Sequence, residues 1–168
     1  TVLTSLVVCS FLVLSHCIEC DSLVASIIMR GPYYFVIVSH EDCPIFELAQ
    51  PGAPKSSDQK IDLNYLTQFV AHASLDMVDE NMWNTPSTYL KVVDRFNDWL
   101  VSAFITPAGL RFLLLHEEAN EERIRVFFQE VYEAYVRLSM NPFFVHGAKI
   151  NSGFFQKKVQ QLARKYFG

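Results

Sequence analysis

Short runs of aromatic and β-branched residues alternate along this chain with longer stretches that carry an apolar residue at every third or fourth position. The short runs, typical of buried strands, lie at 33–39, 45–49, 89–96, 100–106 and 110–115. The longer stretches, typical of amphipathic helices, lie at about 58–82, 121–140 and 152–166. The order β-β-α-β-β-β-α-α contains no βαβ alternation. It therefore predicts an α+β fold, with helices on the faces of an antiparallel sheet.

Capping and turn residues mark the ends of these elements. Asp58 and Asn120 are suited to the N-caps of the first and second helices. Pro142 ends the second helix, because its ring would clash with the preceding turn. Gly109, in the loop between the last two strands, can adopt the left-handed conformation that a tight hairpin requires. The second helix should bury Ile124, Phe128, Val131, Tyr135 and Leu138.

The first helix carries two stripes of residues. The stripe that we expect to cover the sheet consists of Leu63, Leu66, Val70, Ala73 and Met77. The second stripe consists of Tyr65, Phe69, His72, Asp76, Asp79 and Trp83, a quarter-turn or more away at ~100° per residue. Since aromatic residues anchor interfaces and charges orient them, we interpret the second stripe as a partner-binding face centred on Asp76. The alternative is that Phe69 and Trp83 flank the core and the acids are solvated.

Composition and charge limit the possible functions. Half of the 168 residues are hydrophobic, which is enough for a packed core, and the net charge of −4 argues against broad nucleic-acid binding. The chain has no phosphate-binding loop, nucleophile elbow or metal-ligand spacing, so we expect no enzyme, no catalytic, metal-binding or cofactor-binding residues and no cofactor. His72 lacks a nucleophile at predictable range. Asp76, Asp79 and Glu80 are more typical of solvating or capping acids than of a metal site.

The first 28 residues differ from the rest. Thr1–Ile18 is an almost continuous apolar run without Lys or Arg, and three of the four cysteines lie in the first twenty residues. His16, Cys17 and Cys20 superficially suggest a zinc half-site, but no second knuckle follows. One cysteine remains in the rest of the chain, which is not a disulfide framework and is typical of a cytosolic protein. We expect Met29 to be the native start, residues 1–28 to be an apolar extension outside the packed domain, and residues 29–168 to form that domain. The alternative for the extension is a membrane anchor.

Two further motifs have simple structural explanations. Asn141-Pro142-Phe143 matches a short peptide read by endocytic adaptor domains, but a proline stop, with Phe143 and Phe144 folded back on the core, accounts for it. The third helix carries four cations that could contact anionic lipid or simply form a solvated face: Lys157, Lys158, Arg164 and Lys165.

Several blocks, in order and at the right spacing, resemble the sedlin family, which is subunit 2 of the trafficking protein particle (TRAPP) vesicle-tethering complex. The blocks are YYFVIV at Tyr33–Val38, LTQFVAHASLDMVDENMW at Leu66–Trp83, YLKVVDRFNDWLVSAF at Tyr89–Phe104, RFLLLH at Arg111–His116 and SMNPF at Ser139–Phe143. The resemblance covers Met29 to nearly the C-terminus. It implies a longin-like (SNARE-like, profilin-like) domain, a five-stranded antiparallel sheet with one helix on one face and two on the other.

The resemblance also implies a function. The chain would be a non-enzymatic subunit that joins other TRAPP subunits in a hetero-oligomer acting in endoplasmic-reticulum-to-Golgi vesicle transport. The complex would activate a Rab GTPase through other subunits, and would bring this chain, otherwise cytoplasmic and perinuclear, to the periphery of endoplasmic reticulum and Golgi membranes. The alternative is a longin-domain SNARE-type regulator of membrane fusion. That class needs a heptad-repeat helix and an anchor or lipidated cysteine, and we find neither up to Gly168.

Overall fold

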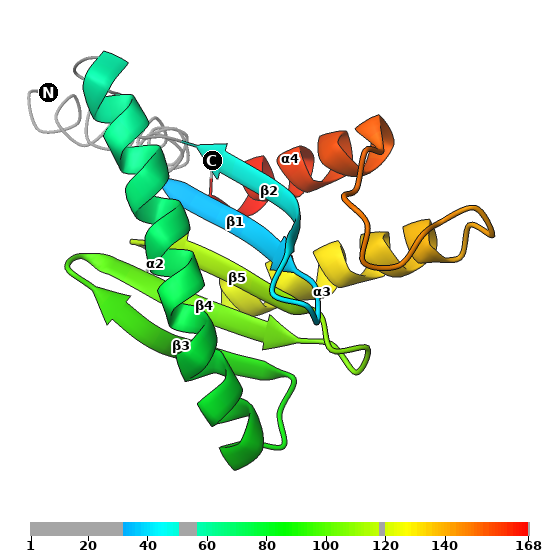
Figure 1. Cartoon of the computed structure of the whole chain (residues 1–168), viewed down its shortest axis with the longest axis horizontal. Helices are drawn as coiled ribbons and strands as arrows, with labels where there is room; N and C mark the ends of the chain where they lie inside the picture. Colours follow the sequence, from blue (N-terminus) through cyan, green and yellow to red (C-terminus); the bar gives the residue numbers. More distant parts are fainter. Residues whose placement is uncertain (1–31, 51–56, 118–119, 168) are drawn as a thin grey trace, which may run out of the picture. The chain divides into compact units, whose positions relative to one another are not determined.

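The sheet has five strands, all antiparallel, in the order β2-β1-β5-β4-β3 (Figure 1). The strands are β1 (Tyr33–Val38), β2 (Pro44–Gln50), β3 (Tyr89–Phe96), β4 (Trp99–Ile105) and β5 (Arg111–His116). In this computed structural model the described residues are 32–50, 57–117 and 120–167, with side chains in 57–64 left out. The expectations for residues 1–28, Met29, Cys17 and Cys20 lie outside them. Residues 31–166 form one compact unit.

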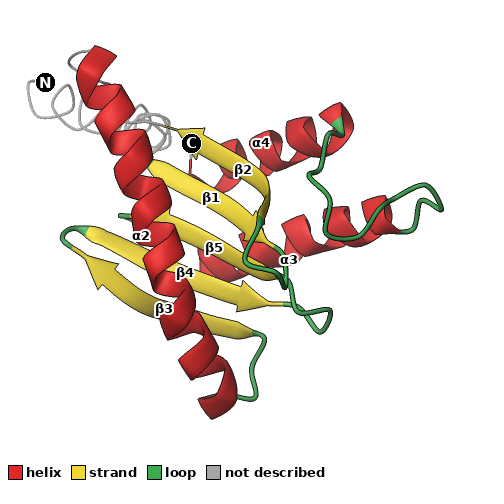
Figure 2. Cartoon of the chain, in the orientation of Figure 1, coloured by secondary structure: helices red, strands yellow, loops and turns green. Residues whose placement is uncertain are grey.

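Three helices cover the two faces of this sheet. They are α2 (Ser57–Asn84), α3 (Glu121–Ser139) and α4 (Gly153–Phe167). Helix α2 crosses one face, and α3 and α4 lie on the other (Figure 2). The predicted α+β class, element order and distribution of helices are therefore confirmed. Within the described ranges, no helix combines the length and apolarity needed to cross a bilayer.

The sheet divides the core into two halves. Strand β1 contributes side chains to both, because successive side chains of a strand point to opposite faces. Tyr34, Val36 and Val38 belong to the cluster under α2, with Val101, Ala103, Leu113 and Leu115 from the other central strands. Phe35, on the opposite face, packs edge-on against Phe127 of α3, with 5.3 Å between ring centroids. All six residues of β1 are buried, so the strand reads as a continuous apolar run.

The predicted sheet-facing stripe of α2 is wrong at most of its positions. The buried positions are Thr67, Val70, Ala71, Ser74, Leu75 and Val78, whereas Leu66, Ala73 and Met77 are exposed. Only Val70 of the predicted stripe is confirmed, and the side chain of Leu63 lies outside the described residues. Two hydroxyl residues share the buried face because their polarity is satisfied there: Ser74 Oγ donates to the Val70 carbonyl at 2.8 Å and lies 3.1 Å from Oδ2 of Asp94.

The predicted helix ends are partly confirmed. Asn120 caps α3, since its side-chain oxygen accepts a hydrogen bond from the Arg123 backbone N–H at 3.3 Å. Asp58 is not an N-cap, because α2 already begins at Ser57. Gly109 adopts a φ of +78°, as the hairpin requires.

The structure also separates the two phenylalanines that follow α3. Phe144 packs against Tyr135 with ring centroids 5.9 Å apart, but Phe143 is exposed. The expectation that both fold back on the core is therefore wrong for Phe143. The Phe143 backbone N–H donates to the side chain of Asn141 at 3.1 Å, which bends the chain so that only one of two successive side chains can face α3.

The predicted stripe of α3 is largely correct. Ile124, Phe128, Val131 and Tyr135 are buried, and Leu138 is half-buried. Phe127 is a further buried residue of the same helix. The regular spacing of these residues positions α3 against the aromatic side of the sheet.

Candidate functional site

The outward side of α2 carries an unusual number of large side chains. Tyr65 and Phe69 are each 68% exposed and Trp83 is 84% exposed. At ~100° per residue these three positions fall almost opposite the buried Val70, Ala71 and Val78. His72 and Asp76 are also exposed and lie on the same side. The structure therefore brings five of the six residues of the predicted second stripe together on the side away from the sheet.

Asp79, the sixth residue, lies at the edge of α2 that faces the sheet. Its Oδ1 lies 3.2 Å from Nε of Arg111 on β5, and Arg111 also pairs with Asp42 of the β1–β2 turn. The arginine N–H is not aimed at Oδ1, so the Asp79 contact is an ion pair and not a hydrogen bond. Asp79 is thus engaged within the domain, unlike Asp76.

Apolar residues beside the second stripe widen the exposed surface. Leu66, Ala73 and Met77 are all exposed. Together with Phe69 they recur at steps of three or four residues along the helix. We refer to Tyr65, Leu66, Phe69, His72, Ala73, Asp76, Met77 and Trp83 together as the outer face of α2. From their spacing, Leu66, Ala73 and Met77 were predicted to pack against the sheet. They were therefore not predicted as surface residues.

The chemistry of the outer face suits contact with another protein. Its polar groups are the His72 imidazole, the Asp76 carboxylate, the Tyr65 hydroxyl and the Trp83 indole N–H, and Glu80 follows nearby. In the described part of the chain, no three His, Cys, Asp or Glu side chains come together as metal ligands. Exposed aromatic rings among a few acids match the composition of protein–protein interfaces, where aromatic residues supply contact area.

His72 also borders a small cavity of about 210 Å³ between α2 and the first two strands. Its polar centre is Glu47, whose Oε2 accepts hydrogen bonds from the Tyr34 hydroxyl at 2.9 Å and from Nε2 of Gln68 at 3.1 Å. Burial, followed by the negative charge of Glu47, raises the pKa of Tyr34 above its ordinary value. Glu47 therefore holds α2 to the sheet through Gln68.

Comparison with known proteins shows which family this sequence matches. A family model described as sedlin matches residues 37–165. The probable trafficking protein particle complex subunit 2 of Drosophila melanogaster is 47% identical over 134 residues, which cover 80% of this chain and 96% of that protein.

Two further relatives agree with this match. The probable trafficking protein particle complex subunit 2 of Caenorhabditis elegans is 42% identical over 80% of this chain and 95% of that protein. The transport protein particle 20 kDa subunit of Schizosaccharomyces pombe is 36% identical over 79% of this chain and 97% of that protein. The similarity thus extends over nearly the whole of each relative.

Proposed function

The chain belongs to the sedlin family, and from this premise we propose that it is a non-enzymatic subunit of the trafficking protein particle complex. It acts in vesicle transport from the endoplasmic reticulum to the Golgi by binding other subunits of that complex. The names of the relatives support this role and do not favour the SNARE-type alternative.

The outer face of α2 is the proposed site of subunit binding. The observation that carries this proposal is the exposure of Tyr65, Phe69 and Trp83 on one side of one helix. A lone exposed aromatic residue needs no explanation, but three on one side with an apolar flank form a patch of the kind that marks interaction sites. Asp76 and His72 supply polar groups that can fix the orientation of a partner.

The cellular part of the proposal follows from the complex and not from this chain alone. The assembled complex activates a Rab GTPase through its other subunits, and this chain contributes binding surface. It is cytoplasmic and perinuclear, and it reaches endoplasmic reticulum and Golgi membranes only as part of the assembly.

Charge reversal at Asp76 tests the proposal. The Asp76→Arg chain and the wild type are each expressed with an affinity tag, and the co-purifying trafficking-complex subunits are quantified by mass spectrometry. We expect the variant to recover far less of at least one subunit, because a like or unpaired charge inside an interface weakens it strongly.

Asp98→Arg is the matched control, since Asp98 is an exposed acid in the β3–β4 turn and not a residue of α2. It should recover the subunits as the wild type does. Circular dichroism should show all three proteins equally folded. Wild-type recovery by the Asp76→Arg protein would reject the outer face of α2 as the binding site. Recovery of none of these subunits by the wild-type chain would reject the proposed function itself.

A further inference from the structure

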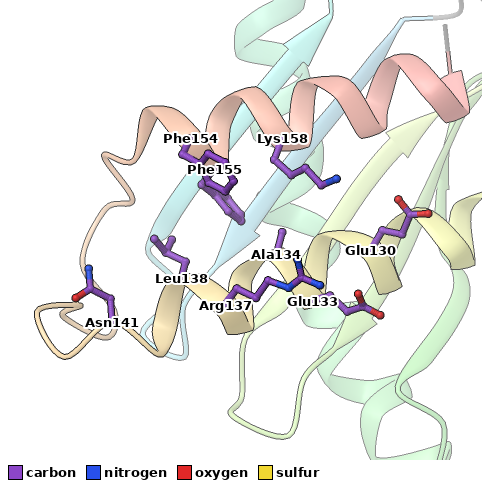
Figure 3. Close-up of a pocket in the computed structure, with 9 residues that line it drawn as sticks. All are labelled: Glu130, Glu133, Ala134, Arg137, Leu138, Asn141, Phe154, Phe155 and Lys158. Carbon is purple, nitrogen blue, oxygen red and sulfur yellow. The ribbon is translucent and has the colours of Figure 1, made fainter.

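A groove with a volume of about 580 Å³ runs between α3 and α4 (Figure 3). Ala134 and Leu138 line it from α3 and Phe155 lines it from α4, which gives it an apolar base. Figure 3 shows Phe155 and Lys158 projecting from α4 toward α3. We call this cavity the α3–α4 groove. It lies on the side of the sheet opposite α2 (Figure 1).

The α3–α4 groove continues into a second cavity of about 260 Å³. Leu138 and Asn141 line both cavities, and Lys149 lines the second. Along α3, the stretch from Glu130 to Leu138 alone spans about 12 Å at ~1.5 Å per residue. That length matches roughly four residues of extended peptide at ~3.3 Å each, before the second cavity is added. The groove and the second cavity are therefore long enough together to hold a short linear peptide.

Exposed apolar side chains line both cavities and the segment that connects α3 to α4. Phe154 at the start of α4 is 82% exposed and lines the groove, and Phe143 lines the second cavity. Met140 and Val145 are also exposed in the same connecting region. A ligand that lay along both cavities would remove Phe143, Val145 and Phe154 from water, and burial of large apolar side chains is favourable.

The charges along this path favour an acidic ligand. Glu130 is already engaged, because its Oε1 accepts hydrogen bonds from Lys165 at 2.9 Å and from the Tyr166 hydroxyl at 2.5 Å. Among the described residues, Arg137, Lys149 and Lys158 form no ion pair, and they outnumber the one unengaged carboxylate, that of Glu133. Together the α3–α4 groove and the second cavity are lined by three cations and two carboxylates, on a chain whose net charge is −4.

We propose that the α3–α4 groove binds an extended peptide segment of a partner protein, in which a bulky apolar side chain stands next to one or more carboxylates. The apolar side chain lies over Leu138, Phe154 and Phe155, and the carboxylates pair with Lys158 and Arg137. Arginine suits this role because its planar group binds a carboxylate with two hydrogen bonds. This site is separate from the outer face of α2 and does not depend on the function proposed for that face.

A random heptapeptide library displayed on phage tests the proposal with the full chain as bait. We expect the selected peptides to share an aromatic residue or leucine beside Asp or Glu. The affinity of one selected peptide is then measured by fluorescence polarisation. Lys158→Glu should weaken its binding roughly tenfold or more, as the loss of a charge-assisted contact requires. Lys157→Glu is the matched control, because Lys157 is exposed on α4 without lining the groove, and it should bind as the wild type does.

Two more variants separate this site from the rest of the surface. Phe154→Ala, at an exposed position that does not support the core, should also weaken the peptide, whereas Asp76→Arg on the opposite side should leave its affinity unchanged. Selection of peptides without the acidic–apolar pairing would overturn the proposal, as would equal affinities for Lys158→Glu and Lys157→Glu. Binding to phosphatidylserine vesicles with no peptide selected would assign the groove to lipid and would also overturn it.

Discussion

Arg111 and Asp79 join the central strand β5 to helix α2 across a distance of 3.2 Å between Nε and Oδ1. The arginine side chain is only 12% exposed, and Asp42 of the β1–β2 turn also contacts it. Three elements that are distant in sequence thus meet at one buried guanidinium. Asp76 and Asp79 of α2 therefore differ, because Asp79 stabilises the domain whereas Asp76 is free to face a partner.

This difference predicts opposite effects for two similar substitutions. Asp79→Asn should lower the free energy of unfolding by about 1 kcal/mol, because Arg111 loses one of its two carboxylates in a largely buried place. Asp76→Asn should change it by less than about 0.5 kcal/mol, as is usual at the surface. Urea denaturation at neutral pH measures both values. Equal stability of the two variants would contradict the role given to Asp79.

The core position of α3 can be tested at Val131, which is fully buried. Val131→Asp should unfold the domain, because an unpaired buried carboxylate costs several kcal/mol out of a typical total of about 5–15 kcal/mol. Gln129→Asp places the same group on an exposed position of the same helix and should leave the protein folded. Circular dichroism and gel filtration distinguish the outcomes. A native-like Val131→Asp protein would refute the placement of α3.

The contact of Glu130 with α4 predicts a stability change in acid. Hydrogen bonds from Tyr166 and then Lys165 hold the pKa of Glu130 below its ordinary value. A carboxylate with a lowered folded pKa stabilises the fold above its unfolded pKa, and this contribution is lost as the pH falls through the folded pKa. The stability lost on Glu130→Gln should therefore be larger at pH 7 than at pH 3, as measured by urea midpoints. Glu133→Gln is the control, and a pH-independent loss at Glu130 would contradict the assignment.

The hairpin between β4 and β5 can be tested at Gly109. Its φ of +78° strains any residue with a Cβ, although the nearest atom to such a Cβ, His40 Cδ2, would lie at an ordinary 3.6 Å. Gly109→Ala should therefore lower the free energy of unfolding by about 1–2 kcal/mol through backbone strain alone. Gly153→Ala meets no atom within 4 Å and lies outside the positive-φ region, so it should be neutral or stabilising. Thermal unfolding compares the two, and equal melting temperatures would exclude the strain.

The strands and α3 could be predicted from sequence because each has a single dominant environment. All of β1 is buried, so its apolar run is uninterrupted. In α3, Ile124, Phe128 and Val131 repeat at helical spacing with charged residues between them, and only one side can face the sheet. Asn120 and Gly109 act through local backbone chemistry, which is independent of the rest of the fold.

Helix α2 could not be assigned in the same way because it has apolar residues on two sides. Leu66, Ala73 and Met77 offered the more apolar stripe, but the sheet covers the stripe that contains Thr67 and Ser74. A pattern of apolar spacing cannot distinguish a stripe that packs on the domain from one that is left exposed. The hydrogen bond from Ser74 to the Val70 carbonyl, which makes the buried stripe acceptable, becomes visible only in three dimensions.

The α3–α4 groove was not predictable for a different reason. Its apolar base combines Leu138 at the end of one helix with Phe155 at the start of the next. Whether such residues close together or leave a space depends on how the 140–152 segment separates the two helices, which no periodicity records. The sequence showed the cations of α4, but their relation to Arg137 required the structure.

The position of β1 between β2 and β5 has a consequence for synthesis of the chain. Its other neighbour is β5, in which Leu115 pairs with Tyr34. This pairing can form only after α2, β3 and β4 have been translated. The two strand groups, β1–β2 and β3–β4–β5, form from local contacts, but the sheet can close only when they meet. Until about residue 116 leaves the ribosome, one edge of β1 stays without a partner. A pause in translation before that point would therefore prolong exposure of an apolar strand edge to chaperones and to aggregation.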